Sequence, residues 1–233
     1  MNDNRTFFIG NTPAVVYGND SENVFLFVHG QCGNKEEAKR FSDIAQLYGW
    51  QTLSIDLPEH NGRKDGVKLL PWNVMPELTA VMDYMQSKWR HIALRANSIG
   101  AWFCLQAFGA YNVEKCMFLS PLLDMENMIS NLMRLSGVTE QRLEIEREIP
   151  TEFGQTLSMD YLDWVRKHPV GAICRDTYIL YATGDELIPE SVYCSFAEKN
   201  NCELTVMNGG EHWFHTDQQL EFLKNWEERI LKG

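Results

Sequence analysis

The sequence predicts an α/β fold in which a mostly parallel central sheet is flanked by helices. The run Asn23–Val28 is almost entirely apolar and is bounded by polar turns, as in a strand buried on both faces of a parallel sheet. Residues 35–48 then carry apolar side chains at a helical period, with charges between them. Strand and helix alternate in this way along most of the 233 residues, and this order builds a parallel sheet with helices on both faces.

The other predicted elements continue this alternation of strands and helices after an initial hairpin. Short β-prone pieces at residues 6–9 and 14–17, separated by Gly10-Asn-Thr-Pro13, predict an edge hairpin. Beyond it we expect strands at 23–28, 51–55, 115–119, 177–181 and 203–206, and helices at 35–48, 71–89, 190–199 and 216–231.

The alternation of strands and helices is interrupted between residues 122 and 171. This segment holds three helical stretches, at 125–135, 140–148 and 159–167, and no strand is expected in it. We therefore expect a single domain, 1–233, with a helical cap inserted at 122–171 over the mouth of the site. Its methionines are open to two interpretations, an adaptable apolar wall or plain packing: Met125, Met128 and Met133.

Net charge and cysteine content indicate which classes of partner and which cellular location the protein has. A net charge of -11 and a pI near 5.0 argue against nucleic acid and against a membrane surface, and favour a small molecule. No signal peptide begins the chain and no apolar run reaches transmembrane length, so we expect a cytoplasmic protein; a homodimer is left open. The cysteines form no C-x-x-C pair and are expected to be reduced, buried thiols: Cys32, Cys104, Cys116, Cys174, Cys194 and Cys202.

One stretch, His91-Ile-Ala-Leu-Arg-Ala-Asn-Ser98-Ile-Gly100, predicts a strand, a very sharp turn and a helix. An apolar segment ends in Ala96-x-Ser98-x-Gly100, and a new apolar run begins at once. In such a turn the central residue is strained, and the residues two before and two after it must be small. The turn holds a hydroxyl above the strand end, facing the N–H groups that open the helix. Ser98 is therefore predicted to be a nucleophile.

Two later strand ends also carry reactive side chains. The strand at 177–181 runs into Thr183-Gly-Asp185, and the strand at 203–206 runs into Asn208-Gly-Gly-Glu-His212. Ligands of an open parallel sheet bind at the carboxyl ends of its strands. A carboxylate and an imidazole thus follow the serine along the chain, each just after a strand.

The order of serine, acid and histidine, with the serine on an elbow, resembles the α/β-hydrolase superfamily over nearly the whole chain. The matching segments are His29-Gly30, Asp56-Leu-Pro58, the elbow at Ser98, Gly184-Asp185 with Pro189, and Gly210-Glu-His212. The chain departs from the pattern twice. Ala96 stands where the elbow commonly begins with glycine, and Glu59-His60 stands where many relatives have a glycine before a histidine.

The resemblance implies a role for each residue. Ser98 attacks a carbonyl carbon, His212 takes its proton as general base, and Asp185 orients the imidazole. The backbone N–H groups of Gln31 and Ile99 form the oxyanion hole that stabilises the developing negative charge. This chemistry requires no metal and no organic cofactor.

Alternatives remain for several of these residues. Asp185 in a Gly-Asp pair also fits an ordinary turn, and Glu186 or Asp124 are the substitute acids. His215 is a rival to His212, and Glu211-His212-x-x-His215 is a weak metal motif without further ligands nearby. We expect His215 to begin the last helix.

Two more histidines are expected to have structural roles. His29 is expected to make hydrogen bonds beneath the oxyanion loop. His60 is expected at the surface or at the rim of the pocket.

The expected function is hydrolysis of a carboxylic ester or thioester of a small molecule through an acyl-enzyme. A serine on the elbow speaks against dehalogenase or epoxide-hydrolase chemistry, which the resemblance associates with a carboxylate nucleophile. An aminopeptidase or amidase uses the same triad and would need an acidic group near the cap, for which three glutamates are available: Glu144, Glu146 and Glu148. A ligand-binding receptor on the same fold is the competing class.

Overall fold

The computed structural model describes residues 6–171 and 176–233. Its centre is an eight-stranded sheet with the order β1-β2-β4-β3-β5-β6-β9-β10. β2 runs antiparallel to β1 and β4, and the six strands from β4 to β10 are mutually parallel. The strands are β1 Thr6–Ile9, β2 Thr12–Tyr17, β3 Asn23–Val28, β4 Gln51–Ile55, β5 His91–Asn97, β6 Lys115–Leu119, β9 Asp176–Ala182 and β10 Glu203–Met207.

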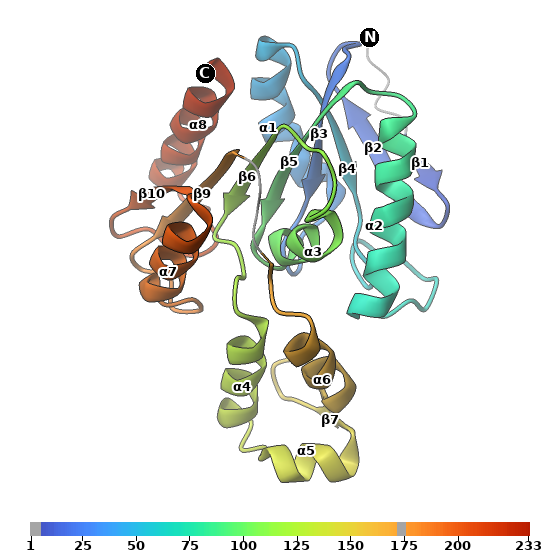
Figure 1. Ribbon diagram of the computed structural model, residues 1–233, viewed down its shortest axis with the longest axis vertical. Helices are drawn as coiled ribbons and strands as arrows, with labels where there is room; N and C mark the ends of the chain where they lie inside the picture. The colour runs from blue at the N-terminus through green and yellow to red at the C-terminus, as the bar shows by residue number, and fades with distance from the viewer. Residues whose placement is uncertain (1–5, 172–175) are drawn as a thin grey trace.

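Helices cover both faces of this sheet (Figure 1). α2, α3 and α7 pack on one face, and α1 and α8 pack together on the other. Side chains of β3 explain why both faces are apolar, because Leu26 points into the first core cluster and Phe27 into the second. The helices are α1 Ala38–Ala45, α2 Pro71–Gln86, α3 Ser98–Phe108, α7 Glu190–Asn200 and α8 Asp217–Lys232.

The mostly parallel sheet predicted from the sequence is confirmed. The hairpin turn is tighter than expected, because Pro13 lies inside β2 and not in the turn. The predicted helix at 35–48 is divided, with single 3₁₀ turns, η1 Lys35–Glu37 and η2 Gln46–Tyr48, on either side of α1. The left-handed Gly49 then ends this segment and leads into β4.

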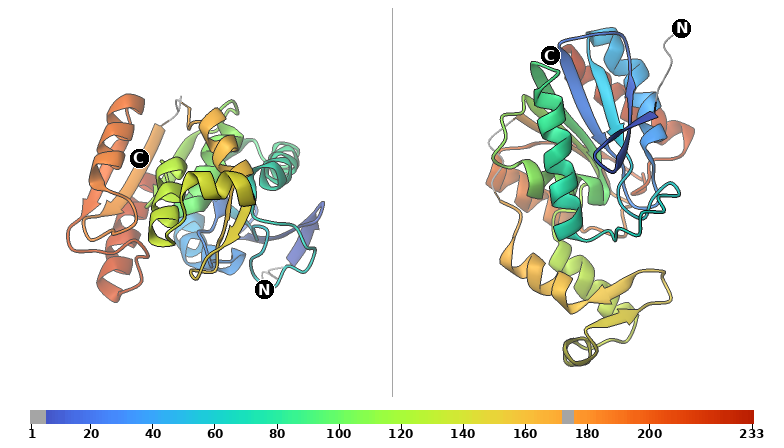
Figure 2. Two further views of the ribbon diagram at one scale, coloured as in Figure 1. Left: turned by 90° about the horizontal axis from the view of Figure 1, so that it is seen from below. Right: turned by 90° about the vertical axis from the view of Figure 1, so that its right-hand side faces the viewer.

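The segment 122–171 projects beyond the carboxyl ends of the parallel strands (Figures 1 and 2). It consists of α4 Met125–Leu135, α5 Glu140–Glu146, a two-stranded sheet of β7 Glu148–Pro150 and β8 Thr156–Ser158, and α6 Met159–Lys167. The expectation that this segment contains no strand is therefore wrong. α5 ends early because Arg147 adopts a positive φ of 65°, which turns the chain into β7.

Aromatic side chains fasten the cap to α3. The Trp102 ring lies 6.0 Å from Tyr161 and 5.8 Å from Trp164, both on α6. Met125 and Met133 are buried in the main core cluster, which supports plain packing as the role of these methionines.

The cysteines are less uniform than expected. Cys104 and Cys116 are buried and Cys202 is half-buried, whereas Cys32 and Cys194 are exposed; Cys174 lies outside the described residues. Within residues 6–171 and 176–233, no helix combines the length and the apolar character that crossing a membrane requires.

Candidate active site

Ser98 occupies the sharp turn between β5 and α3. β5 ends at Asn97, and Ser98 opens α3 with a φ of 47°, a conformation that a residue with a side chain seldom adopts. The helix can start this close to the sheet only because Gly100 lacks a side chain. A Cβ atom there would lie 2.3 Å from the carbonyl oxygen of His29 and 2.7 Å from that of Val28.

The structure brings Ser98, His212 and Asp185 into one chain of hydrogen bonds. The Oγ of Ser98 lies 2.9 Å from Nε2 of His212, and Nδ1 of His212 lies 2.7 Å from Oδ2 of Asp185. A carboxylate on Nδ1 favours the tautomer with the proton there, which leaves Nε2 free to accept from the serine hydroxyl. The side chains of His212 and Asp185 are only 4% and 1% exposed.

Asp185 accepts three further hydrogen bonds. Its Oδ1 accepts from the backbone N–H of Leu187 at 2.9 Å and of Ile188 at 3.1 Å, and its Oδ2 accepts from the Tyr193 hydroxyl at 2.9 Å. Burial alone would raise the pKa of Asp185, but its bonds to His212, Leu187 and Tyr193 hold that pKa below its ordinary value. The carboxylate therefore stays ionised beside the imidazole.

The loops that carry Asp185 and His212 contact each other directly. They follow the neighbouring parallel strands β9 and β10, and the Gly184 N–H donates to the Gly210 carbonyl at 3.0 Å. A Cβ atom on Gly184 would lie 2.4 Å from that oxygen. A glycine at this position thus lets the acid and the histidine approach each other.

The loop after β3 passes close to the serine. A Cβ atom on Gly30 would lie 3.3 Å from the Cβ of Ser98, and Gln31 lines the same cavity as Ser98. Ile99 is the second residue of α3, so its N–H lies among the first-turn donors that have no partner within a helix. These are the two amides that the sequence predicts as oxyanion donors.

Two buried histidines hold this loop in place. The Nε2 of His29 accepts from the Leu57 N–H at 3.0 Å, so its Nδ1 carries the proton and donates to the Gly30 carbonyl at 2.8 Å. The Nε2 of His60 accepts from the Cys32 N–H at 3.1 Å. Burial lowers the pKa of His29 to about 4. His60 is only 5% exposed, so the expectation of a surface or rim position is wrong.

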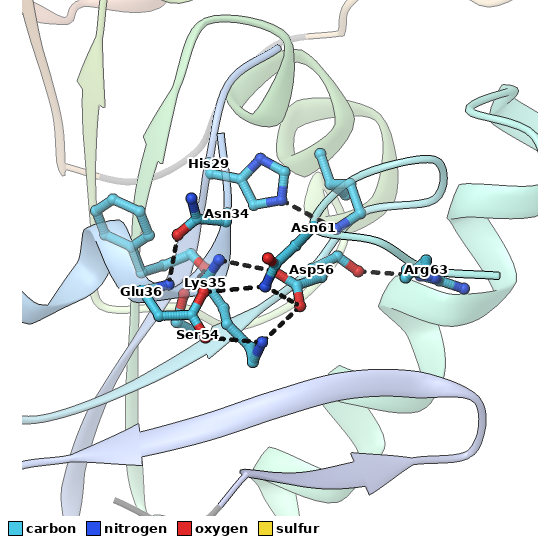
Figure 3. Close-up of polar contacts among 10 residues, drawn as sticks. His29, Asn34, Lys35, Glu36, Ser54, Asp56, Asn61 and Arg63 are labelled. Carbon is cyan, nitrogen blue, oxygen red and sulfur yellow. Dashed lines mark hydrogen bonds and ion pairs between the residues drawn. The ribbon is translucent and has the colours of Figure 1, made fainter. Parts of the chain in front are cut away.

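A buried ion pair fixes the same loop to the one that follows β4 (Figure 3). The Nζ of Lys35 lies 2.7 Å from Oδ2 of Asp56, and the Lys35 N–H donates to Oδ1 at 2.8 Å. The side chains are 7% and 2% exposed, and the Asn61 amide donates to the same carboxylate. The sequence pointed to Asp56 only through the Asp56-Leu-Pro58 match, and nothing in the spacing indicated Lys35 as its partner.

The fold resembles those of solved esterases and hydrolases. Est1E from Butyrivibrio proteoclasticus with bound ferulic acid matches with a TM-score of 0.79 at 18% identity, over 98% of each chain. A putative hydrolase from Agrobacterium vitis S4 matches with a TM-score of 0.77 at 18% identity, over 94% of this chain and 92% of that one. The Pyrococcus furiosus esterase Pf2001 matches with a TM-score of 0.69 at 14% identity, over 95% and 85%.

This chain has the α/β-hydrolase fold. The assignment depends on structure alone, because no protein-family model and no curated protein matches the sequence.

Within this α/β-hydrolase fold, the substitute residues lie elsewhere. Glu186 is exposed, and Asp124 caps α4 by accepting from the Asn127 N–H at 3.0 Å. His215 is 59% exposed beside Glu211 and precedes α8. Across residues 6–171 and 176–233, no group of histidine, cysteine or acidic side chains could hold a metal ion.

A cavity of about 370 Å³ opens beside Ser98 and His212. Its walls come from the loop after β3, from the sheet, from α1 and α8, and from Trp213 and Phe214, which follow His212 in the sequence. None of these lining residues belongs to the segment 122–171. The expectation that the cap lies over the mouth of the site is therefore not supported for this cavity.

Proposed function

We propose that this protein is a serine hydrolase that cleaves a carboxylic ester or thioester of a small molecule. The observation that supports this proposal most directly is the hydrogen-bond chain from Ser98 through His212 to Asp185. A serine hydroxyl is a weak nucleophile at neutral pH unless a base removes its proton during attack. The imidazole is at hydrogen-bonding distance for that transfer.

In the first half of the reaction Ser98 is acylated. The Oγ atom forms a bond to the carbonyl carbon while Nε2 of His212 takes the hydroxyl proton, and Asp185 stabilises the resulting imidazolium. The Gln31 and Ile99 amides serve as donors to the carbonyl oxygen as it becomes negative. The bond to the leaving alcohol or thiol then breaks, and His212 returns the proton to that group.

In the second half, water replaces the leaving group. His212 takes a proton from this water as its oxygen attacks the acyl carbon. The carboxylic acid departs, and Ser98 regains its proton.

The descriptions of two structural neighbours agree with this proposal, since Pf2001 is described as an esterase and XC6422 from Xanthomonas campestris as an α/β serine hydrolase. The amidase alternative has less support. Glu146 lies on α5 in the cap and pairs with Arg142 at 2.7 Å, and neither it nor Glu144 or Glu148 lines the cavity beside Ser98.

A fluorophosphonate probe tests the proposal. We expect covalent labelling of the wild type, no labelling of Ser98→Ala, and unchanged labelling of Ser191→Ala, which alters an exposed serine on α7. Hydrolysis of small esters should follow the same pattern. An unlabelled wild type that binds small esters without cleaving them would instead support the receptor alternative.

A further inference from the structure

The cavity beside Ser98 has both apolar and charged walls. Its apolar walls are formed by aromatic and aliphatic side chains: Phe27, Phe41, Leu119, Phe214, Leu220 and Leu223. Arg95 of β5 and Glu227 of α8 also line it.

Arg95 and Glu227 form an ion pair with side chains that are each 2% exposed. The Nε of Arg95 lies 3.0 Å from Oε1 of Glu227, and its Nη2 lies 2.9 Å from the same oxygen. The rings of Phe27 and Phe41 lie 5.6 and 5.8 Å from the guanidinium carbon. The pair is thus a fixed polar site enclosed by aromatic side chains.

This site has unused hydrogen-bonding capacity. Both contacts from Arg95 end on Oε1, and within the described part of the chain Oε2 of Glu227 accepts no hydrogen bond. The Nη1 group of Arg95 is occupied by the Ala96 carbonyl and by Oδ1 of Asn97, whereas the polar contact of Nη2 among the described residues is with Glu227 alone. A carboxylate oxygen and a guanidinium N–H are therefore available to a ligand in the cavity.

Stability alone does not account for this pair. A buried ion pair can usually be replaced by apolar side chains of similar volume without loss of stability, because desolvation of the two charges offsets their attraction. A site of this kind in the wall of a cavity is better explained by recognition of a polar group.

The charges of the cavity indicate which polar group fits. Arg95 is balanced by Glu227, and the other charged lining residues, Arg40 and Glu37, also balance each other. A charged ligand group would thus meet one like charge for each opposite charge. A hydroxyl group is neutral, donates to a carboxylate and accepts from a guanidinium, so it satisfies both free positions at once.

The position of the cavity beside Ser98 suits the acyl part of the substrate. Nη1 of Arg95 donates to Oδ1 of Asn97, the residue before Ser98, at 2.6 Å. The leaving group must exit to solvent before water attacks, whereas the acyl group stays attached to Ser98 until the end. A cavity that begins beside Ser98 therefore fits the acyl group.

We infer that Arg95 and Glu227 bind a hydroxyl group on the acyl chain, so that the preferred substrates are esters of hydroxy acids. This inference rests on the proposed function. Hydrogen bonding to a buried charged pair selects strongly for the group it matches, because an acyl chain without the hydroxyl leaves both positions unpaired.

The test compares methyl esters that differ only in the terminal hydroxyl: hexanoate with 6-hydroxyhexanoate, and octanoate with 8-hydroxyoctanoate. For the wild type we expect kcat/KM to be at least about tenfold higher for the hydroxy ester in one of these pairs. Ser98→Ala should bind the same hydroxy ester at least about tenfold more tightly than its counterpart by calorimetry.

The double variant Arg95→Met/Glu227→Leu should bring the hydroxy-to-plain ratio to about one, whatever its effect on the absolute rates. The matched control is Arg229→Met/Glu203→Leu, which removes an exposed ion pair between α8 and β10 with a separation of 2.6 Å. This control should keep the wild-type ratio.

Equal kcat/KM values within both ester pairs would overturn the inference while leaving the hydrolase proposal intact. A double variant that keeps the wild-type ratio would overturn it as well. If the wild type hydrolyses no ester, the hydrolase proposal fails, and the binding ratio of Ser98→Ala still decides whether the cavity selects a hydroxyl. Failure of the double variant to fold leaves that binding ratio and the wild-type kinetics as the deciding measurements.

Discussion

The replacement of Gly100 by alanine tests whether close contact between α3 and β3 positions Ser98, the proposed nucleophile. An added Cβ atom would lie 2.3 Å from the carbonyl oxygen of His29. Carbon–oxygen contacts normally begin near about 3.3 Å, so the start of α3 must move away from the end of β3 by about 1 Å. Ser98 lies two residues away in the first turn of this helix and would move with it.

Both stability and activity should respond. Overpacking of this kind costs about 1–3 kcal/mol in the free energy of unfolding. In a domain of this size a loss of about 2 kcal/mol lowers the Tm by about 4–8 °C. A displacement of about 1 Å at the nucleophile reduces the rate by up to about a hundredfold, because attack requires close alignment with the carbonyl carbon.

The matched control is Gly109→Ala at the other end of the same helix. Gly109 has a helical φ of -55°, and a Cβ atom there would lie 3.5 Å from the Leu105 carbonyl, an ordinary contact. We expect this variant to keep the wild-type Tm or to exceed it slightly, and to hydrolyse esters at the wild-type rate.

Calorimetric melting and ester hydrolysis at a temperature well below both Tm values would distinguish the two effects. A Gly100→Ala protein with a Tm within about 1 °C of wild type and kcat/KM within about twofold of wild type would refute the reasoning. The start of α3 and the end of β3 would then accommodate a methyl group without moving apart.

Three further outcomes are expected. Asp185→Asn should lower kcat by roughly a thousandfold or more with little change in Tm, because the imidazole loses both its orientation and its counter-charge; kinetics and melting check this. The pKa of His29 is lowered to about 4, so the unfolded protein binds more protons between pH 4 and 6.5 and stability should rise with pH across this window, by up to about 3 kcal/mol. Urea unfolding should show this slope in the wild type and a reduced slope in His29→Gln. His60→Ala should lower kcat more than it changes KM, since the Cys32 N–H loses its acceptor and the loop that carries Gln31 loosens; the exposed His168→Ala is the control.

The order of the chain was enough to predict the sheet and the sharp turn at Ser98, the proposed nucleophile. Strands such as Asn23–Val28 carry apolar residues that serve both faces, and this pattern is local. The turn at Ser98 is also local, because small residues at Ala96 and Gly100 permit the sharp reversal. The cap strands β7 and β8 were missed because each has only three residues, too few to show a period of two.

The candidate site could be predicted in part, because Ser98, Asp185 and His212 each follow a strand and parallel strands end at one edge of the sheet. The sequence left Glu186, Asp124 and His215 as alternatives, and residue spacing did not distinguish them from Asp185 and His212. In the structure, the distances between side chains show that Asp185 and His212 are the acid and the histidine connected to Ser98.

Contacts between segments that are distant in the sequence could not be predicted from the sequence. His60 lies in a polar loop, and its burial follows from a hydrogen bond with Cys32, 28 residues away. Arg95 and Glu227 are 132 residues apart and meet because α8 packs on the face of the sheet toward which Arg95 points. Local residue patterns therefore determined the helices, the strands and the sharp turn at Ser98. Tertiary packing decided which polar side chains are buried together, because burial and pairing depend on neighbours that are distant in the sequence.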